Sequence, residues 1–126
     1  NVGKILKTIY ITFHVSRASV RMRNEDLEKI FICIKEFIKR VGAIPMAVGG
    51  VENHIHILAT LPKDKALSDY VRTIKANSSR WIKTLDAHYS KFSWQIGYGA
   101  FSVSPSHLKK VILFIRCQSE SYKRIL

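Results

Sequence analysis

The stretch Ile44–Leu61, IPMAVGGVENHIHILATL, contains two short apolar segments joined by a turn-forming sequence. The segments are Ile44–Gly50 and Ile55–Leu61, and the connection between them is rich in glycine and asparagine. Short apolar runs bounded by such residues are typical of strands joined in a β-hairpin. We therefore expect an antiparallel hairpin, with His54 and His56 at the start of its second strand.

The sequence on both sides of this hairpin alternates between strand and helix patterns. Thr8–Val15 and Tyr98–Val103 are rich in β-branched and aromatic residues, which favours strands. Apolar residues at helical spacing predict a helix from the N-cap Asn24 to Val41, a second from about Ser68 to Asp86, and a third from Pro105 to about Lys123. The order β-α-β-β-α-β-α predicts an α+β fold. We expect a ferredoxin-like (RRM-like) antiparallel sheet with helices on one face and an added C-terminal helix.

The composition describes a short and strongly basic chain. It has 126 residues, 21 Lys+Arg against 9 Asp+Glu, and a formal net charge of +12. With neither linker nor repeat, residues 1–126 are predicted to form one domain. The positive charge favours a polyanionic partner, because each cation placed against a phosphate releases condensed counterions. Secreted disulfide scaffolds, membrane spans and proteins for acidic-ligand chemistry are disfavoured, and Cys33 and Cys117 are expected to be buried thiols in a reducing cytoplasm.

Polar residues on two predicted inner faces are candidates for metal binding. The tripeptide HIH places His54 and His56 on one side of a strand, where they can share a metal ion, although two unrelated histidines explain the tripeptide alone more simply. The apolar stripe of the last helix contains Gln118 and Tyr122, with Phe114 at its edge, and a buried amide needs a hydrogen-bond partner or a metal. Together His54, His56 and Gln118 can form a neutral three-ligand site that leaves a cation its full charge for a phosphate.

Four segments in order resemble one protein family. They are ENHIHILATLP (52–62), DYVRTIKANSSRWI (69–82), WQIGYGAFSVSPS (94–106) and VILFIRCQ (111–118). Their order and spacing resemble those of the single-tyrosine HUH (His, hydrophobic, His) endonucleases. These enzymes are the transposases of the insertion-sequence-200/605 type and their REP-associated relatives. The resemblance implies a homodimer that binds imperfect DNA hairpins and cleaves and rejoins single-stranded DNA through a 5′-phosphotyrosine intermediate. It also implies Mg²⁺ or Mn²⁺ held by His54, His56 and Gln118.

The sequence departs from this family at the nucleophile. The family tyrosine lies four residues before the helix glutamine, where this chain has Phe114, and a phenyl ring lacks the attacking oxygen. Three explanations are open: an engineered Tyr→Phe change, a naturally inactive copy, or the use of another tyrosine. Tyr122 is the best placed of these, although packing is its simpler role. The alternative functions are an inactive regulator that binds hairpin DNA on the same fold and, more remotely, an unrelated RNA-binding module.

Basic residues outside the histidine pair are candidates for DNA contact. They lie in the loop after the first strand and on the second helix, and are Arg17, Arg21, Arg23, Arg72, Lys75, Arg80 and Lys83. Arg72, Lys75 and Lys83 are expected to point away from the core. Any one of them fits an ordinary solvated surface, but together they exceed what solubility requires. His14, His88 and His107 are interpreted as structural or exposed. We expect a cytoplasmic, nucleoid-associated protein with no membrane partner.

Overall fold

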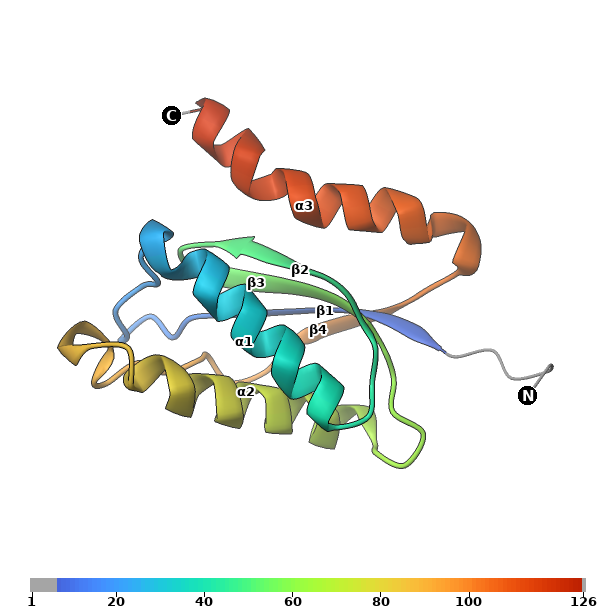
Figure 1. Ribbon diagram of the computed structural model, residues 1–126, viewed down its shortest axis with the longest axis horizontal. Helices are drawn as coiled ribbons and strands as arrows, with labels where there is room; N and C mark the ends of the chain where they lie inside the picture. Colours follow the sequence, from blue (N-terminus) through green and yellow to red (C-terminus); the bar gives the residue numbers. More distant parts are fainter. Residues whose placement is uncertain (1–6, 126) are drawn as a thin grey trace.

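A computed structural model describes residues 7–125 of the chain, with side chains for residues 7–117. The elements of this described part follow the predicted order (Figure 1). The strands are β1 (Thr8–His14), β2 (Pro45–Val51), β3 (His54–Thr60) and β4 (Gly99–Val103), and the helices are α1 (Leu27–Arg40), α2 (Leu67–Lys83) and α3 (Leu108–Ile125). The predicted α+β class is confirmed.

The strands form one antiparallel sheet in the order β2-β3-β1-β4. In the pairing of β1 with β3, His14 lies opposite His54 and Thr12 lies opposite His56. On the other side of β3, Gly49 of β2 lies opposite His56. Because side chains alternate along a strand, this register puts the even-numbered residues of β1 on the same face of the sheet as both histidines.

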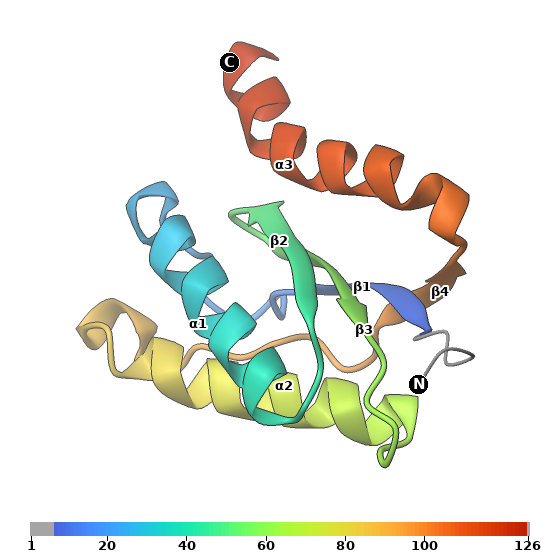
Figure 2. The same ribbon diagram turned by 45° about the vertical axis from the view of Figure 1, so that its right-hand side comes forward.

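Helices cover both faces of the sheet (Figures 1 and 2). On one face, α1 and α2 pack over an apolar core that includes Ile11, Ile57 and Ile34, all fully buried. On the other face α3 crosses the sheet, where Ile115 packs against Ala47 and Leu58. The predicted added helix therefore lies opposite α1 and α2, and the histidine face of the sheet lies under it.

The predicted starts of α1 and α3 and the predicted end of α2 are wrong, because a short 3₁₀ turn adjoins the helix at each of these ends; α3 begins at Leu108, after the turn Pro105–His107. Asn24 does not cap α1; it begins a 3₁₀ turn, Asn24–Asp26, and α1 starts at Leu27 without a side-chain cap. Asp26 accepts a hydrogen bond of 2.6 Å from the hydroxyl of Tyr89. Similarly, α2 ends before Asp86, since that carboxylate accepts from the backbone N–H of His88 at 2.7 Å and starts a new turn.

The two cysteines differ in their exposure. Cys33 is buried in α1, as predicted, and burial raises the pKa of its thiol to about 12. Cys117 is exposed, so the prediction of a buried thiol is wrong for this residue. It lies two positions after Ile115, which faces the sheet, and two positions along a helix turn a side chain to the far side. In the part of the chain that is described, no helix is long and apolar enough to cross a bilayer.

Candidate metal and nucleophile site

The two histidines at the start of β3 lie side by side on the α3 side of the sheet. Their ring centroids are 4.7 Å apart and their planes meet at 84°. Ile55, between them in the chain, is fully buried in the core under α1 and α2. The alternation predicted for the HIH tripeptide is therefore present, and the intervening isoleucine secures the strand while both imidazoles face α3.

Each imidazole is held through its Nδ1 atom. The Nδ1 of His56 is hydrogen-bonded to the hydroxyl of Tyr10, and the Nδ1 of His54 lies 2.7 Å from Oδ1 of Asn53. The Asn53 amide oxygen accepts, and the Tyr10 hydroxyl oxygen is able to accept, so both partners are compatible with a ring proton on Nδ1 and an Nε2 lone pair left for a metal. Among the described residues, Nε2 of His56 is buried and has no hydrogen-bond partner. A buried nitrogen without a partner fits a site for a divalent cation.

Burial keeps the two imidazoles in their neutral forms. The pKa of His56 is lowered to about 4, first by burial and then by the neighbouring His54 and His14. The pKa of His54 is lowered for the same reasons, burial first and His14 second. Metal ligation requires a neutral imidazole. At neutral pH no proton therefore has to leave these rings before a cation binds.

Helix α3 brings position 114 next to this pair. The Phe114 ring centroid lies 5.8 Å from that of His56, and the two planes meet at 76°. Phe114 is 54% exposed, in keeping with its predicted place at the edge of the apolar stripe. Gly49 permits this close approach, because a methyl group there would lie 2.7 Å from the carbonyl oxygen of Ile115. The predicted nucleophile position and the second histidine therefore meet within one chain.

Two predicted site residues lie on α3 beyond the side chains that are described. Gln118 and Tyr122 both belong to this helix. The predicted roles of Gln118 as a metal ligand and of Tyr122 as an alternative nucleophile stay predictions. Within residues 7–117, no group of three His, Cys, Asp or Glu side chains is arranged to hold a metal ion.

Two residues of β1 belong to the site although sequence analysis did not place them there. The ring of His14, which is exposed as expected, lies 5.3 Å from that of His54 between centroids. Tyr10 contacts His56 directly. A period of two along β1 puts Tyr10 and His14 on one face. Only the pairing register shows that this face carries the β3 histidines.

The predicted DNA-contacting arginines are exposed, and most have a partner on the surface. The pairs are Arg21–Glu52 at 3.2 Å, Arg23–Asp86 at 2.9 Å and Arg72–Asp69 at 3.1 Å, and Arg80 donates to Asn77 at 3.2 Å. Exposed pairs of this kind contribute only about 0–1 kcal/mol, so a phosphate can replace a partner at small cost. Arg17 and Arg21 line a polar cavity of about 330 Å³ that also contains Asn53 and His14. Asn53 and His14 both contact His54, so this cavity lies next to the histidine pair.

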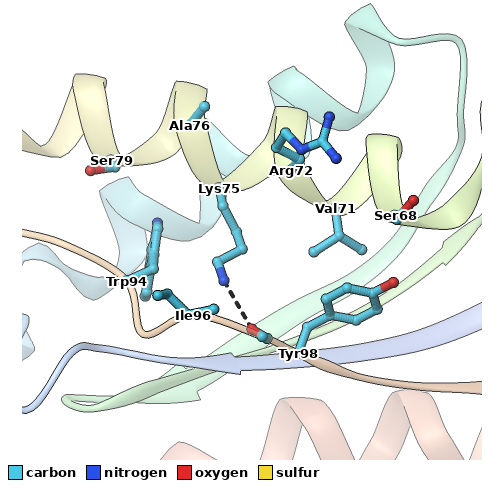
Figure 3. A pocket seen from close by; sticks show the side chains of 10 residues that line it. Ser68, Val71, Arg72, Lys75, Ala76, Ser79, Trp94, Ile96 and Tyr98 are labelled. Carbon is cyan, nitrogen blue, oxygen red and sulfur yellow. Dashed lines mark hydrogen bonds between the residues drawn. The ribbon is translucent and has the colours of Figure 1, made fainter.

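The prediction that Lys75 points away from the core is wrong. Its Nζ donates to the carbonyl oxygen of Gly97 at 2.9 Å (Figure 3). It also donates to the carbonyl oxygen of Gln95 at 2.7 Å and lies 5.7 Å from the centroid of the Phe13 ring. Burial lowers the pKa of this ammonium group. Lys75 thus fastens the chain before β4 to α2. Lys75 lines a groove of about 460 Å³ between α2 and the chain before β4. Arg72 lines this groove too and keeps an exposed side chain.

Comparison with known proteins assigns the chain to a class. Residues 6–118 match the IS200-like transposases, and the chain belongs to this family of DNA transposases. The resemblance inferred from the four sequence segments is confirmed.

Two solved structures share the fold. A protein from Deinococcus radiodurans R1 that is assigned as a transposase superposes with a TM-score of 0.69 at 16% identity, over 92% of this chain and 94% of that one. A REP-associated tyrosine transposase bound to a REP hairpin superposes with a TM-score of 0.67 at 18% identity, over 94% of this chain and 70% of that one. No curated protein sequence matches significantly.

Proposed function

We propose that this chain is a hairpin-binding DNA transposase domain whose machinery for cleaving and rejoining single strands is complete except for the nucleophile. It would work as a homodimer and form a 5′-phosphotyrosine intermediate if position 114 carried a tyrosine. One observation carries the proposal: Phe114 lies beside His56, whose buried Nε2 has no partner among the described residues. Whether this phenylalanine is engineered or natural does not alter the chemistry.

The proposed metal ligands are His54, His56 and Gln118, with Mg²⁺ or Mn²⁺ as the ion. Both imidazoles are neutral and held through Nδ1, which suits ligation through Nε2. When bound, the ion would polarise the scissile phosphate and help to hold its oxygens in line. The three ligands carry no charge, so they would not compete with the phosphate for the positive charge of the site.

Exposed arginines and one lysine are the proposed contacts to the DNA backbone. Arg17 and Arg21 line the polar cavity beside His54 and suit a single strand that leads into the site. Arg23, Arg72, Arg80 and Lys83 are exposed and suit phosphates further along the hairpin. Lys75 is left out of this set, since its ammonium is already bound to two carbonyls. The hairpin in the solved relative supports DNA of this kind as the partner.

The missing hydroxyl defines the step that this chain would not complete. A tyrosine oxygen at position 114 would attack the scissile phosphorus, the bond to the 3′ oxygen would break, and that oxygen would leave as a 3′-hydroxyl. The phosphotyrosine ester conserves the free energy of the broken bond for rejoining. Without that oxygen, Phe114 leaves a protein that binds hairpins and does not cut.

A covalent-adduct assay tests this proposal. The wild type, Phe114→Tyr and the control Phe101→Tyr are incubated with Mn²⁺ and a REP-type imperfect hairpin that has single-stranded flanks, then separated on a denaturing gel. Phe101 and Phe114 both line one apolar groove. The Phe101→Tyr variant therefore adds a phenol near position 114 but not at that position. We expect an adduct only with Phe114→Tyr. An adduct in the wild type that Tyr122→Phe removes would instead make Tyr122 the nucleophile.

Binding by the same proteins separates the transposase from a regulator. Hairpin affinity should fall steeply as salt rises from 50 mM to about 200 mM, because phosphate contacts release counterions. Tight, salt-dependent binding without an adduct in any variant would favour the inactive hairpin-binding regulator. A flat response to salt would contradict the proposed arginine contacts.

A further inference from the structure

We infer that Tyr10 is a positioning residue of the metal site: its hydroxyl holds the ring of His56 in the tautomer and orientation that turn Nε2 toward the ion. This inference rests on the metal site of the proposed function and adds to it a residue from β1 that touches neither the ion nor the DNA.

The position of Tyr10 follows from the strand register. Tyr10 lies opposite Leu58 on β3, and Thr12 lies opposite His56, so Tyr10 and His56 are diagonal neighbours on one face. The Tyr10 hydroxyl is hydrogen-bonded to Nδ1 of His56. The two rings are stacked with centroids 5.6 Å apart and planes 23° from parallel. The tyrosine thus meets the histidine with both its ring and its oxygen.

A second aromatic ring fixes Tyr10 from its other side. Phe101 on β4 lies opposite Tyr10 in the sheet, and their ring centroids are 6.2 Å apart with planes 29° from parallel. Tyr10 is therefore held between Phe101 and His56. A side chain confined in this way loses little further freedom when it orients its neighbour, so the hydrogen bond can set the ring of His56 firmly.

The chemistry of imidazole gives this hydrogen bond its consequence. A neutral imidazole carries one ring proton, and a cation can bind Nε2 only when that proton is on Nδ1. The oxygen of Tyr10 can accept a hydrogen bond from Nδ1–H, which keeps the proton on that nitrogen. Nε2, which is buried and without a partner in the described part of the molecule, then keeps its lone pair. His56 is only 8% exposed, so little water is present to take over the role of Tyr10.

The same geometry argues against Tyr10 as a substitute nucleophile. The two nitrogens of an imidazole point to different sides of the ring, so a hydroxyl bonded to Nδ1 lies away from an ion at Nε2. The Tyr10 hydroxyl is already engaged at Nδ1, whereas Phe114 of α3 packs against the His56 ring and holds no such bond. Tyr10 therefore acts through His56 and not on the substrate.

The test uses two readouts on Tyr10→Phe, with Tyr98→Phe as the control that removes a phenol oxygen in the groove beside α2. The first is the pair of ¹⁵N ring shifts of His56 in the metal-free protein at neutral pH, which report the tautomer. The second is Mn²⁺ affinity measured by electron paramagnetic resonance. We expect the wild type and Tyr98→Phe to carry the proton on Nδ1. Tyr10→Phe should shift it toward Nε2 and bind Mn²⁺ about 10-fold more weakly.

The outcomes separate this inference from the proposed function. An unchanged tautomer and an unchanged Mn²⁺ affinity in a folded Tyr10→Phe protein would overturn the positioning role. A wild type that binds no Mn²⁺, with a His56 tautomer that still depends on Tyr10, would overturn the proposed metal site and support the control of the ring by Tyr10. Thermal unfolding of each variant checks that the fold is retained.

Discussion

The two faces of the sheet are built from different kinds of side chain. Toward α1 and α2, the strands present fully buried aliphatic and aromatic residues such as Ile11, Phe13 and Ile57. Toward α3, β1 and β3 present three threonines, a tyrosine and three histidines beside Leu58, and Ile115 and Leu58 are the fully buried aliphatic residues where α3 meets the sheet. The first face holds the fold together, and the second carries the candidate site.

This difference shows how a small domain accommodates polar chemistry. Each large apolar side chain buried on the α1 and α2 face contributes about 1.5–3 kcal/mol. The α3 face gives up part of that contribution and leaves a histidine nitrogen buried without a partner in the described residues, which is costly unless a ligand binds it. We therefore expect the α3 layer to be the less stable one and to open before the rest of the domain.

The sharpest test of this contrast removes the same atoms from each face. Ile57→Ala should lower the free energy of unfolding by about 4 kcal/mol, because it leaves a cavity in a closed core. Ile115→Ala should cost about 2 kcal/mol, because α3 can shift to fill the space. Both side chains are almost fully buried in the folded protein, at 0% and 1% exposure. Urea unfolding gives the free energies.

Hydrogen exchange then shows which layer opens in each variant. In Ile115→Ala, faster exchange should be confined to the backbone of residues 108–117. In Ile57→Ala it should rise throughout the sheet. Equal losses of stability with global exchange in both variants would mean that the two faces form one cooperative unit.

A pH titration without metal should weaken the histidine face selectively. The pKa of His56 is about 4 in the folded protein and 6.5 for an ordinary imidazole. Above pH 6.5 neither state binds a proton there, so the contribution of this residue is fully present. As the pH falls toward 4, the unfolded chain binds the proton and the folded chain does not. The free energy of unfolding should therefore decrease by up to about 3 kcal/mol.

The matched control for this titration is His56→Gln, which removes the titrating ring. In EDTA, the free energy of unfolding of His56→Gln should change much less between pH 6.5 and pH 5 than that of the wild type. Ordinary carboxylates titrate below this range. Parallel curves for the wild type and His56→Gln would show that burial of this imidazole is not linked to stability.

The smallest expected effect on stability comes from a methyl group added between the sheet and α3. Gly49→Ala places a methyl group 2.7 Å from the Ile115 carbonyl oxygen, so α3 must move outward. We expect a loss of about 1–2 kcal/mol. A larger relative loss of DNA adduct is expected in the Phe114→Tyr background, because the nucleophile would move away from His56. The control Gly99→Ala meets side-chain atoms alone, the Thr12 methyl group at 3.1 Å and a Phe101 ring carbon at 3.9 Å, and should keep most of the adduct.

Local sequence patterns predicted most of the helices and strands and part of the candidate site. The apolar stripe of α1, the hairpin of β2 and β3 and the shared face of His54 and His56 all follow from periods of 3.6 and two residues, which depend only on neighbours in the chain. The strands agree with the prediction to within one residue at each end, whereas the helix ends were less well predicted. Asn24, for example, does not cap α1 but begins a 3₁₀ turn, and Asp26 of that turn bonds to Tyr89, a residue far along the chain.

The part of the site that sequence patterns missed depends on pairing between distant segments. Tyr10 and His14 reach the β3 histidines only through the register of β1 against β3, and a slip of one residue would turn both to the other face. Lys75 looked like a surface cation because its helix position is polar, whereas its partners are carbonyl oxygens of a loop 20 or more residues away.

By itself, the amino-acid sequence determined the order of strands and helices, the positive charge, the family and the absence of a hydroxyl at position 114, since each of these depends on residue identity or short spacing. Only the tertiary structure decided that α3 covers the face opposite α1 and α2, with Phe114 against His56 and Tyr10 on its Nδ1. The reason is that strand register and helix docking are set by the burial of side chains from segments far apart in the chain, and no local period encodes them.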